Sequence, residues 1–185
     1  GPGAAAVRVH VDGMRALVDL FERRGVGAFV FASSTAVYGH RNGSWVDESS
    51  YTSPRSFGGR LRLDAEEVLQ EAFRRSLFPA VILRLAPMYG AGDRHFRWIQ
   101  AGSFRLVGGG DAWMSLIHID DAVRALQAAA SRGRAGQAYV VSDDRPATVK
   151  EWAYYVAGQL RVPRPIPVAP EEARRLYDET TYDAL

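Results

Sequence analysis

The chain has 185 residues, of which 47% are hydrophobic and 11% aromatic, so it can bury a core and is not a disordered tail. Its 23 basic and 21 acidic residues give a formal charge of +2 and are scattered along the chain, which argues against a nucleic-acid role. The absence of cysteine excludes disulfides, thiolate nucleophiles and cysteine-ligated zinc. No apolar run approaches the roughly 18 residues of a membrane span, so we predict no membrane contact and, by default, a cytoplasmic location. We also predict no metal site.

The first predicted element is an amphipathic helix over residues 9–24. Its apolar residues recur at three- and four-residue steps, and Gly25 and Gly27 mark its end. The apolar residues assigned to its packed face are Val11, Met14, Leu17, Val18 and Phe21. Residues 28–32 are uniformly apolar, as is typical of a parallel strand buried on both faces. The polar, glycine- and serine-rich segment 39–59 then predicts a long functional loop.

A second amphipathic helix begins near Gly59 and ends before Pro79, and a second apolar strand covers residues 80–85. This alternation predicts an α/β fold with a parallel sheet and helices on its faces. Beyond Tyr89 the elements are shorter. Strands are predicted around 104–107, 115–119 and 138–141, and helices around 121–131, 149–160 and 171–177. We therefore divide the chain into residues 1–90, joined by a strand returning around 138–142, and a smaller lobe formed mainly by residues 91–185.

Four segments in order carry a resemblance to a known family. They are Val9-His10-Val11-Asp12-Gly13, Ser33-Ser34-Thr35-Ala36-Val37-Tyr38-Gly39, Leu83-Arg84 with Tyr89-Gly90, and Leu116-Ile117-His118-Ile119-Asp120-Asp121. Together they resemble the extended short-chain dehydrogenases/reductases of the NAD-dependent epimerase/dehydratase type. The resemblance implies the later part of a Rossmann-like, doubly wound sheet, a substrate-binding C-terminal lobe, and NAD or NADP as cofactor.

The resemblance also assigns site residues. Ser34 takes the place of the catalytic serine or threonine, although Ser33 and Ser34 could instead simply end a strand and bond to backbone. The carboxyl ends of strands border the ligand crevice in open α/β sheets, which favours a role in the site. The expected cofactor-binding residues are Ala32, Ser33, Arg62, Pro87 and Met88, and the expected substrate-binding residues are Thr35, Arg94 and Arg97.

The sequence departs from the family where its Tyr-x-x-x-Lys motif opens a helix. In the run Phe57-Gly58-Gly59-Arg60-Leu61-Arg62, Gly58 stands at the tyrosine position and Arg62 at the lysine position. Glycine can neither give nor take a proton. A guanidinium stays protonated, so Arg62 could hold a ribose or phosphate but could not replace the acid/base step.

A second departure is the missing glycine-rich turn that would meet a dinucleotide pyrophosphate. The run 108–110 follows a late strand, so we interpret it as a turn. The family's first strands and helices would occupy on the order of 60 residues before Val9. The chain is therefore either a fragment or a natural reduced form, and a fragment is favoured because a parallel sheet cut through its centre exposes apolar edges.

Several further polar residues have two interpretations each. His10 replaces a family asparagine that supports a proton-relay water, and its unperturbed pKa of about 6.5 suits proton exchange, but a histidine on a helix is more often structural. Arg94 and Arg97 suit the phosphates of a nucleotide diphosphate, or form a solvated turn. His95 is a further polar candidate. His118, followed by two aspartates, has the pattern of a helix start.

The leading functional hypothesis is a diverged epimerase/dehydratase-like enzyme with the usual redox step altered or lost. Its substrate would be a nucleotide sugar or a related small carbonyl or hydroxyl metabolite. One alternative is a catalytically silent binding or scaffold protein that uses the loop 39–59 to contact a partner. Another is an NAD(P)-dependent oxidoreductase or epimerase with non-standard residues. The resemblance further implies a homodimer formed through the helices that include residues 9–24 and 60–75.

Overall fold

The computed structural model describes residues 2–39 and 43–177, and the chain divides into two compact units. The first comprises residues 1–88 and 117–142, and the second residues 89–116 and 143–185. The first unit thus gains a helix as well as a strand from the range 91–185, because the apolar face of that helix packs on the sheet.

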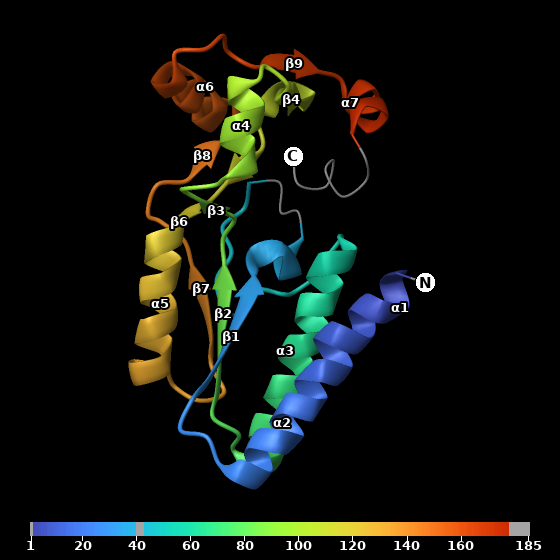
Figure 1. The fold of residues 1–185 in the computed structure, drawn as a ribbon, viewed down its shortest axis with the longest axis vertical. Helices are drawn as coiled ribbons and strands as arrows, with labels where there is room; N and C mark the ends of the chain where they lie inside the picture. The colour runs from blue at the N-terminus through green and yellow to red at the C-terminus, as the bar shows by residue number, and fades with distance from the viewer. Residues whose placement is uncertain (1, 40–42, 178–185) are drawn as a thin grey trace. The chain divides into compact units, whose positions relative to one another are not determined.

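Three parallel strands form the sheet of the first unit, in the order β1-β2-β7 (Figure 1). They are β1 Phe29–Ser34, β2 Ala80–Leu85 and β7 Ala138–Val141. Phe29 lies opposite Ala80, and Ser34 lies opposite Leu85 at the carboxyl ends. All residues of β2 are buried, as expected for a central parallel strand covered on both faces. The prediction of an α/β fold with a parallel sheet is confirmed.

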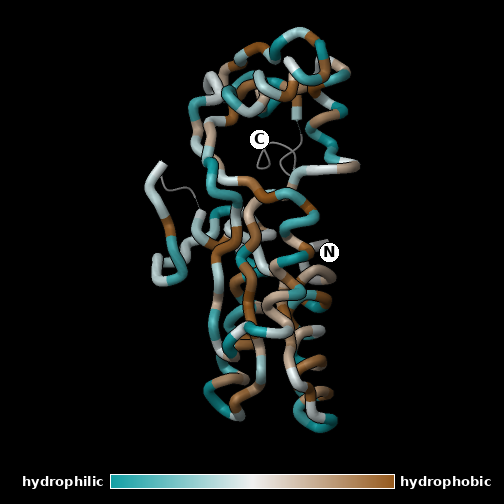
Figure 2. Tube along the Cα trace, turned by 90° about the vertical axis from the view of Figure 1, so that its left-hand side faces the viewer, coloured by the Kyte–Doolittle hydropathy of each residue, from teal (hydrophilic) through white to brown (hydrophobic). Residues whose placement is uncertain are grey.

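Helices cover both faces of this sheet, and alternate residues of β2 serve two cores. Ala80 and Ile82 pack with α2 (Gly13–Arg24) and α3 (Phe57–Ser76). Val81, Leu83 and Leu85 pack on the other side with α5 (Ile119–Arg132). In Figure 2 the brown, hydrophobic stretches of this unit include its strands.

The N-terminal helix is longer than predicted and is interrupted. Helix α1 (Pro2–Val7) leads through a π-helical turn, η1 (Arg8–Asp12), into α2, which ends at Gly25 with a φ of 75°. Val11, Met14 and Val18 are buried as predicted, whereas Leu17 is 42% exposed, so its place on the packed face was wrong. Leu17 instead lines the groove described below.

The segment between β1 and α3 starts with a 3₁₀ turn, η2 (Thr35–Tyr38), and residues 43–56 form neither helix nor strand. The Ser53 N–H donates to the Val37 carbonyl at 2.9 Å. Gly39 has a φ of 66°, and a Cβ there would lie 2.2 Å from the Ser53 carbonyl oxygen. Glu48 accepts a hydrogen bond from the Val140 N–H of β7 at 2.8 Å. The predicted loop is therefore anchored at both the turn and the sheet.

The second unit is built of short elements. They are α4 Arg94–Gln100, β4 Arg105–Val107, the 3₁₀ turn η3 Gly108–Gly110, β5 Trp113–Met114, β8 Ala147–Thr148, α6 Val149–Leu160, β9 Ile166–Val168 and α7 Pro170–Leu176. Of the two-residue strands, β3 (Met88–Tyr89) contains the point at which the chain passes from the first unit to the second, and β6 (Ile117–His118) begins the return to the first unit. Helix α6 has the predicted bounds, and residues 108–110 form the predicted turn. None of the described helices combines the length and apolar character that crossing a bilayer requires.

Candidate functional site

Polar groups gather where β1 ends, in the first unit. Ser34 is the last residue of β1 and the N-cap of η2, and its hydroxyl oxygen accepts the Ala36 N–H at 3.2 Å. This bond uses an acceptor position of the hydroxyl and leaves its proton free to donate. Ser34 thus caps backbone, as one interpretation expected, without losing the ability to donate to a ligand oxygen.

The first turn of α3 packs beside this strand end. A Cβ on Gly59 would lie 2.8 Å from the Ala36 carbonyl oxygen, so only glycine permits this approach. A Cβ on Gly58 would meet nothing within 4 Å. The Arg62 Nη1 donates to the Ala32 carbonyl at 2.9 Å. Gly58 and Arg62 therefore both lie on the part of α3 that packs beside the end of β1.

A buried ionic cluster lies deeper along the same helix. Arg84 of β2 donates to the Glu66 carboxylate through Nη2 at 2.8 Å and through Nε at 3.1 and 3.3 Å. The Ser33 hydroxyl donates to Glu66 at 2.5 Å, and Arg84 Nη1 donates to the Tyr38 hydroxyl at 2.7 Å. Because the Ser33 hydroxyl donates its proton to Glu66, it has no proton left to donate to a cofactor.

Burial and charge act against each other on the pKa values in this cluster. Burial raises the pKa of the Tyr38 phenol above 10.0, against the opposing effect of the hydrogen bond from Arg84. Burial tends to lower the pKa of Arg84, but hydrogen bonds to Glu66 and Tyr38 outweigh it, so that the pKa is raised. Tyr38 is therefore a neutral structural phenol at ordinary pH, and Arg84 is a fixed cation.

Sequence reasoning missed Glu66 and Arg84 as a pair. Two signals pointed to it. Arg84 interrupts an otherwise apolar strand, and a charge there requires a partner. Glu66 directly follows Ala65 on the helix face that contacts the sheet. Predicting that Glu66 contacts Arg84 would have required knowing which turn of α3 lies beside which residue of β2, and residue spacing does not give this.

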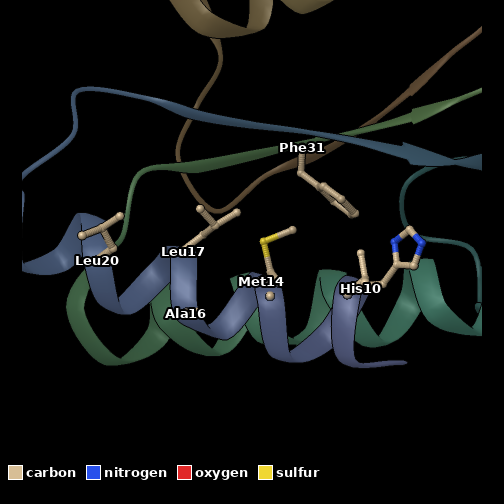
Figure 3. A pocket seen from close by; sticks show the side chains of 8 residues that line it. His10, Met14, Ala16, Leu17, Leu20 and Phe31 are labelled. Carbon is tan, nitrogen blue, oxygen red and sulfur yellow. The ribbon is translucent and has the colours of Figure 1, made fainter. Parts of the chain in front are cut away.

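His10 lies on η1 and lines an apolar groove of about 460 Å³ (Figure 3). Figure 3 shows its imidazole near Phe31 of β1, with Met14, Leu17 and Leu20 along the helix. Within the described part of the chain, no hydrogen bond joins His10 to Ser34 or Arg62. Its predicted catalytic role stays a prediction.

The other expected cofactor residues lie just after β2. Pro87 and Met88 are exposed, and the Pro87 carbonyl accepts the Ile117 N–H at 3.1 Å. Thr35, the expected substrate-binding residue of this unit, begins η2 and is half-buried. The structure thus brings Ala32, Ser33, Ser34, Thr35 and Arg62 into one neighbourhood.

The remaining expected substrate residues lie in the second unit, on α4. Arg94 stacks over the Trp98 ring at 5.3 Å, and Arg97 is exposed. The His95 Nδ1 is hydrogen-bonded at 2.8 Å to Oδ1 of Asp93, which caps α4. In the first unit, His118 caps α5 by accepting the Asp120 N–H at 3.3 Å, which confirms the predicted helix start.

Comparison with known proteins places this geometry in a family. Residues 2–142 match the NAD dependent epimerase/dehydratase family. A dTDP-glucose 4,6-dehydratase of Streptomyces griseus is 28% identical over 78% of this chain and 47% of its own length. An Escherichia coli O157:H7 protein, N-acetyl-alpha-D-glucosaminyl-diphospho-ditrans,octacis-undecaprenol 4-epimerase, is 30% identical over 62% of this chain and 37% of its own.

Solved structures agree on the fold. A dTDP-glucose 4,6-dehydratase from Streptomyces venezuelae with NAD bound superposes with a TM-score of 0.80 at 23% identity, over 93% of this chain and 56% of that one. A functionally unknown conserved protein from Silicibacter pomeroyi gives 0.78 at 30% identity, over 92% and 60%. The chain spans between a third and about half the length of the first curated relatives that it matches. With the family match covering most of its residues, the chain belongs to the NAD-dependent epimerase/dehydratase family.

Proposed function

We propose that this chain is part of a diverged enzyme that binds a nucleotide sugar, or a related small metabolite, and whose usual redox step is altered or lost. The observation that carries the proposal is the neighbourhood of Gly58, Arg62 and Ser34. The helix start is packed at the end of β1 as an active site would require, yet position 58 has no side chain to exchange a proton. The relatives named as dehydratase and epimerase support the substrate class.

NAD or NADP is the expected cofactor, and Arg62 is the residue that we expect to hold its ribose or phosphate. Arg62 already hydrogen-bonds to a neutral carbonyl, and a guanidinium can donate through five N–H groups, so donors remain for a ligand. The cofactor supplies hydride transfer when it is bound. The proton that must accompany hydride transfer has no source at position 58.

Binding tests the first half of the proposal. In the full-length protein, we expect dTDP-glucose or a UDP-sugar to raise the melting temperature, and NADH or NADPH to show changed fluorescence. A shift by the nucleotide sugar alone would indicate a non-redox enzyme. The absence of any shift with both ligand classes would contradict the proposal.

A gain-of-function variant tests the second half. In Gly58→Tyr/Arg62→Lys, the added Cβ meets no neighbour, and the introduced phenol and ammonium restore the family's acid/base pair. General acid catalysis contributes on the order of 10²–10⁴-fold, so we expect sugar-dependent reduction or epimerisation at least about 100-fold above the parent. The matched control Gly58→Phe/Arg62→Lys has the ring without the hydroxyl and should stay at the parent level. High activity in the unmodified protein would disprove the loss of the redox step.

The second candidate is a silent binding protein that contacts a partner through the loop before α3. Trp45 in this loop is 84% exposed, and tryptophan is enriched at protein–protein interfaces relative to the rest of the surface. Under this alternative, Trp45→Ala would abolish partner capture while leaving any nucleotide-sugar binding unchanged.

A further inference from the structure

Three positions of α3 lie on one side of the helix because they are four residues apart: 58, 62 and 66. Arg62 bonds to the Ala32 carbonyl, and Glu66 accepts from the Ser33 hydroxyl, so two neighbouring residues of β1 are tied to two successive turns of α3. Figure 1 shows α3 beside the sheet strands. This side of the helix is therefore fixed along the carboxyl end of β1.

The deepest of the three positions is also the most constrained. Glu66 is 2% and Arg84 is 9% exposed, and their contacts through Nε and Nη2 fix the guanidinium plane. Arg84 Nη1 extends the network to Tyr38, in the turn that follows Ser34. The network thus joins β1, η2, α3 and β2. A buried network with its partners satisfied holds one arrangement, because any other leaves a charge without a partner.

The charges in this region do not cancel at Arg62. Glu66 neutralises Arg84, whereas the hydrogen-bond partner of Arg62 in the described chain is an uncharged carbonyl. Gly58 lies one turn away from Arg62 and in the first turn of α3, where backbone N–H groups add positive potential. The space above Gly58 is consequently electropositive as long as Arg62 stays in place.

We propose that Glu66 and Arg84 are positioning residues of the candidate site, which hold Arg62 and position 58 against the end of β1. They act through α3 and do not touch a ligand themselves. The proposal rests on the proposed function only for the use of the site, since the positioning can be measured without any ligand.

A thiol placed at position 58 provides that measurement. The chain has no cysteine, so Gly58→Cys introduces a single thiol, and its Cβ meets no neighbour. The dependence of its alkylation by iodoacetamide on pH gives the thiol pKa. We expect a pKa at or below about 7.5, against about 8.5 for a free thiol, because Arg62 and the helix start favour the thiolate. Adding Arg62→Met should return the pKa most of the way to 8.5.

The network variants are then made in this Gly58→Cys background. Arg84→Lys keeps the charge but loses the planar fork. If Arg84 acts only through its charge, the thiol pKa should not change. If it positions α3, the thiol pKa should rise toward the Arg62→Met value. Glu66→Gln removes a negative charge, which alone would lower the thiol pKa, whereas lost positioning raises it. The matched control Glu67→Gln removes a charge from the exposed neighbouring position and should not raise the pKa.

Milder variants keep the test decisive if these chains fail to fold. Ser33→Ala and Tyr38→Phe each remove one hydroxyl from the network and leave its charges intact. A raised thiol pKa in folded variants supports positioning. Folded Arg84→Lys, or folded Ser33→Ala and Tyr38→Phe, with the thiol pKa of the Gly58→Cys parent would overturn it. Failure of nucleotide-sugar binding alone would count against the proposed function and leave this result unaffected.

Discussion

Helix α3 takes part in two clusters that share a serine, a glutamate and an arginine. The buried cluster contains Ser33, Glu66 and Arg84 in addition to Tyr38, and the exposed cluster contains Ser76, Glu22 and Arg75. Their shortest contacts are nearly equal in length. The shortest arginine–carboxylate distance is 2.8 Å in the buried cluster and 2.9 Å in the exposed one, and the serine hydroxyl lies 2.5 Å from the carboxylate in both.

The difference between the clusters is access to water. The side chains of Arg84 and Glu66 are 10% and 3% exposed, whereas those of Arg75 and Glu22 are 56% and 26% exposed. Water and salt ions can replace a lost partner at the exposed cluster but not at the buried one. Contact distances alone therefore do not reveal how strongly a cluster holds its elements together.

The largest expected effect is that of Arg84→Met. It leaves Glu66 buried without its partner, so we expect the free energy of unfolding to fall by about 3–5 kcal/mol, measured by urea denaturation. The double variant Glu66→Leu/Arg84→Met removes both charges and should cost less than the single variant. A double variant at least as unstable as Arg84→Met would show that packing, not charge, dominates the cluster.

Tyr38→Phe removes the hydroxyl that accepts from Arg84, and we expect a loss of about 1.5–3 kcal/mol at neutral pH. The raised pKa of Tyr38 adds a pH dependence. The folded state holds the phenol proton more tightly than the unfolded chain, so wild-type stability falls as pH rises above 10.0. In urea titrations across this range, the variant should show a smaller fall. An identical fall in both proteins would contradict the assignment.

The first turn of α3 contains two adjacent glycines with opposite expectations. Gly59→Ala pushes a Cβ against the Ala36 carbonyl and should destabilise the protein by about 1–3 kcal/mol. Gly58→Ala meets no neighbour and should stabilise it by about 0.5–1 kcal/mol through helix propensity. Thermal unfolding of the two variants distinguishes them, and equal effects would mean that the helix start is not packed on η2.

The smallest effect is expected for Glu22→Gln in the exposed cluster. Hydrogen bonds from Ser76 and Arg75 hold the pKa of Glu22 below 4.5, so its contribution is present above that pH and disappears as pH falls through the lowered value. We expect a small drop in melting temperature at pH 7 that vanishes in acid and shrinks in high salt. A drop as large as that of Arg84→Met would break the contrast between the clusters.

The pattern of apolar residues predicted the main helices and strands. Contacts between side chains far apart in the sequence could not be predicted from it. Residues 80–85 form the predicted strand, and every residue in it is buried. A short, mainly apolar run is enough to predict such a strand, without knowing which elements pack on it. The π-helical turn at 8–12 left no trace in the apolar spacing, which reads as one continuous helix. The contact of Arg62 with Ala32 spans 30 residues, and such contacts depend on how the elements pack.

The bond from the Val140 N–H to Glu48 has a consequence for observing the loop before α3. This amide belongs to β7, while its acceptor is a loop carboxylate 92 residues away in sequence. While Glu48 accepts this hydrogen bond, the Val140 amide is protected from exchange with deuterium. If the loop moves away and the bond breaks, the amide is exposed to solvent and exchanges. A single backbone probe, read by NMR, therefore reports loop opening, and a ligand that seats the loop would slow exchange there without changing the rest of the sheet.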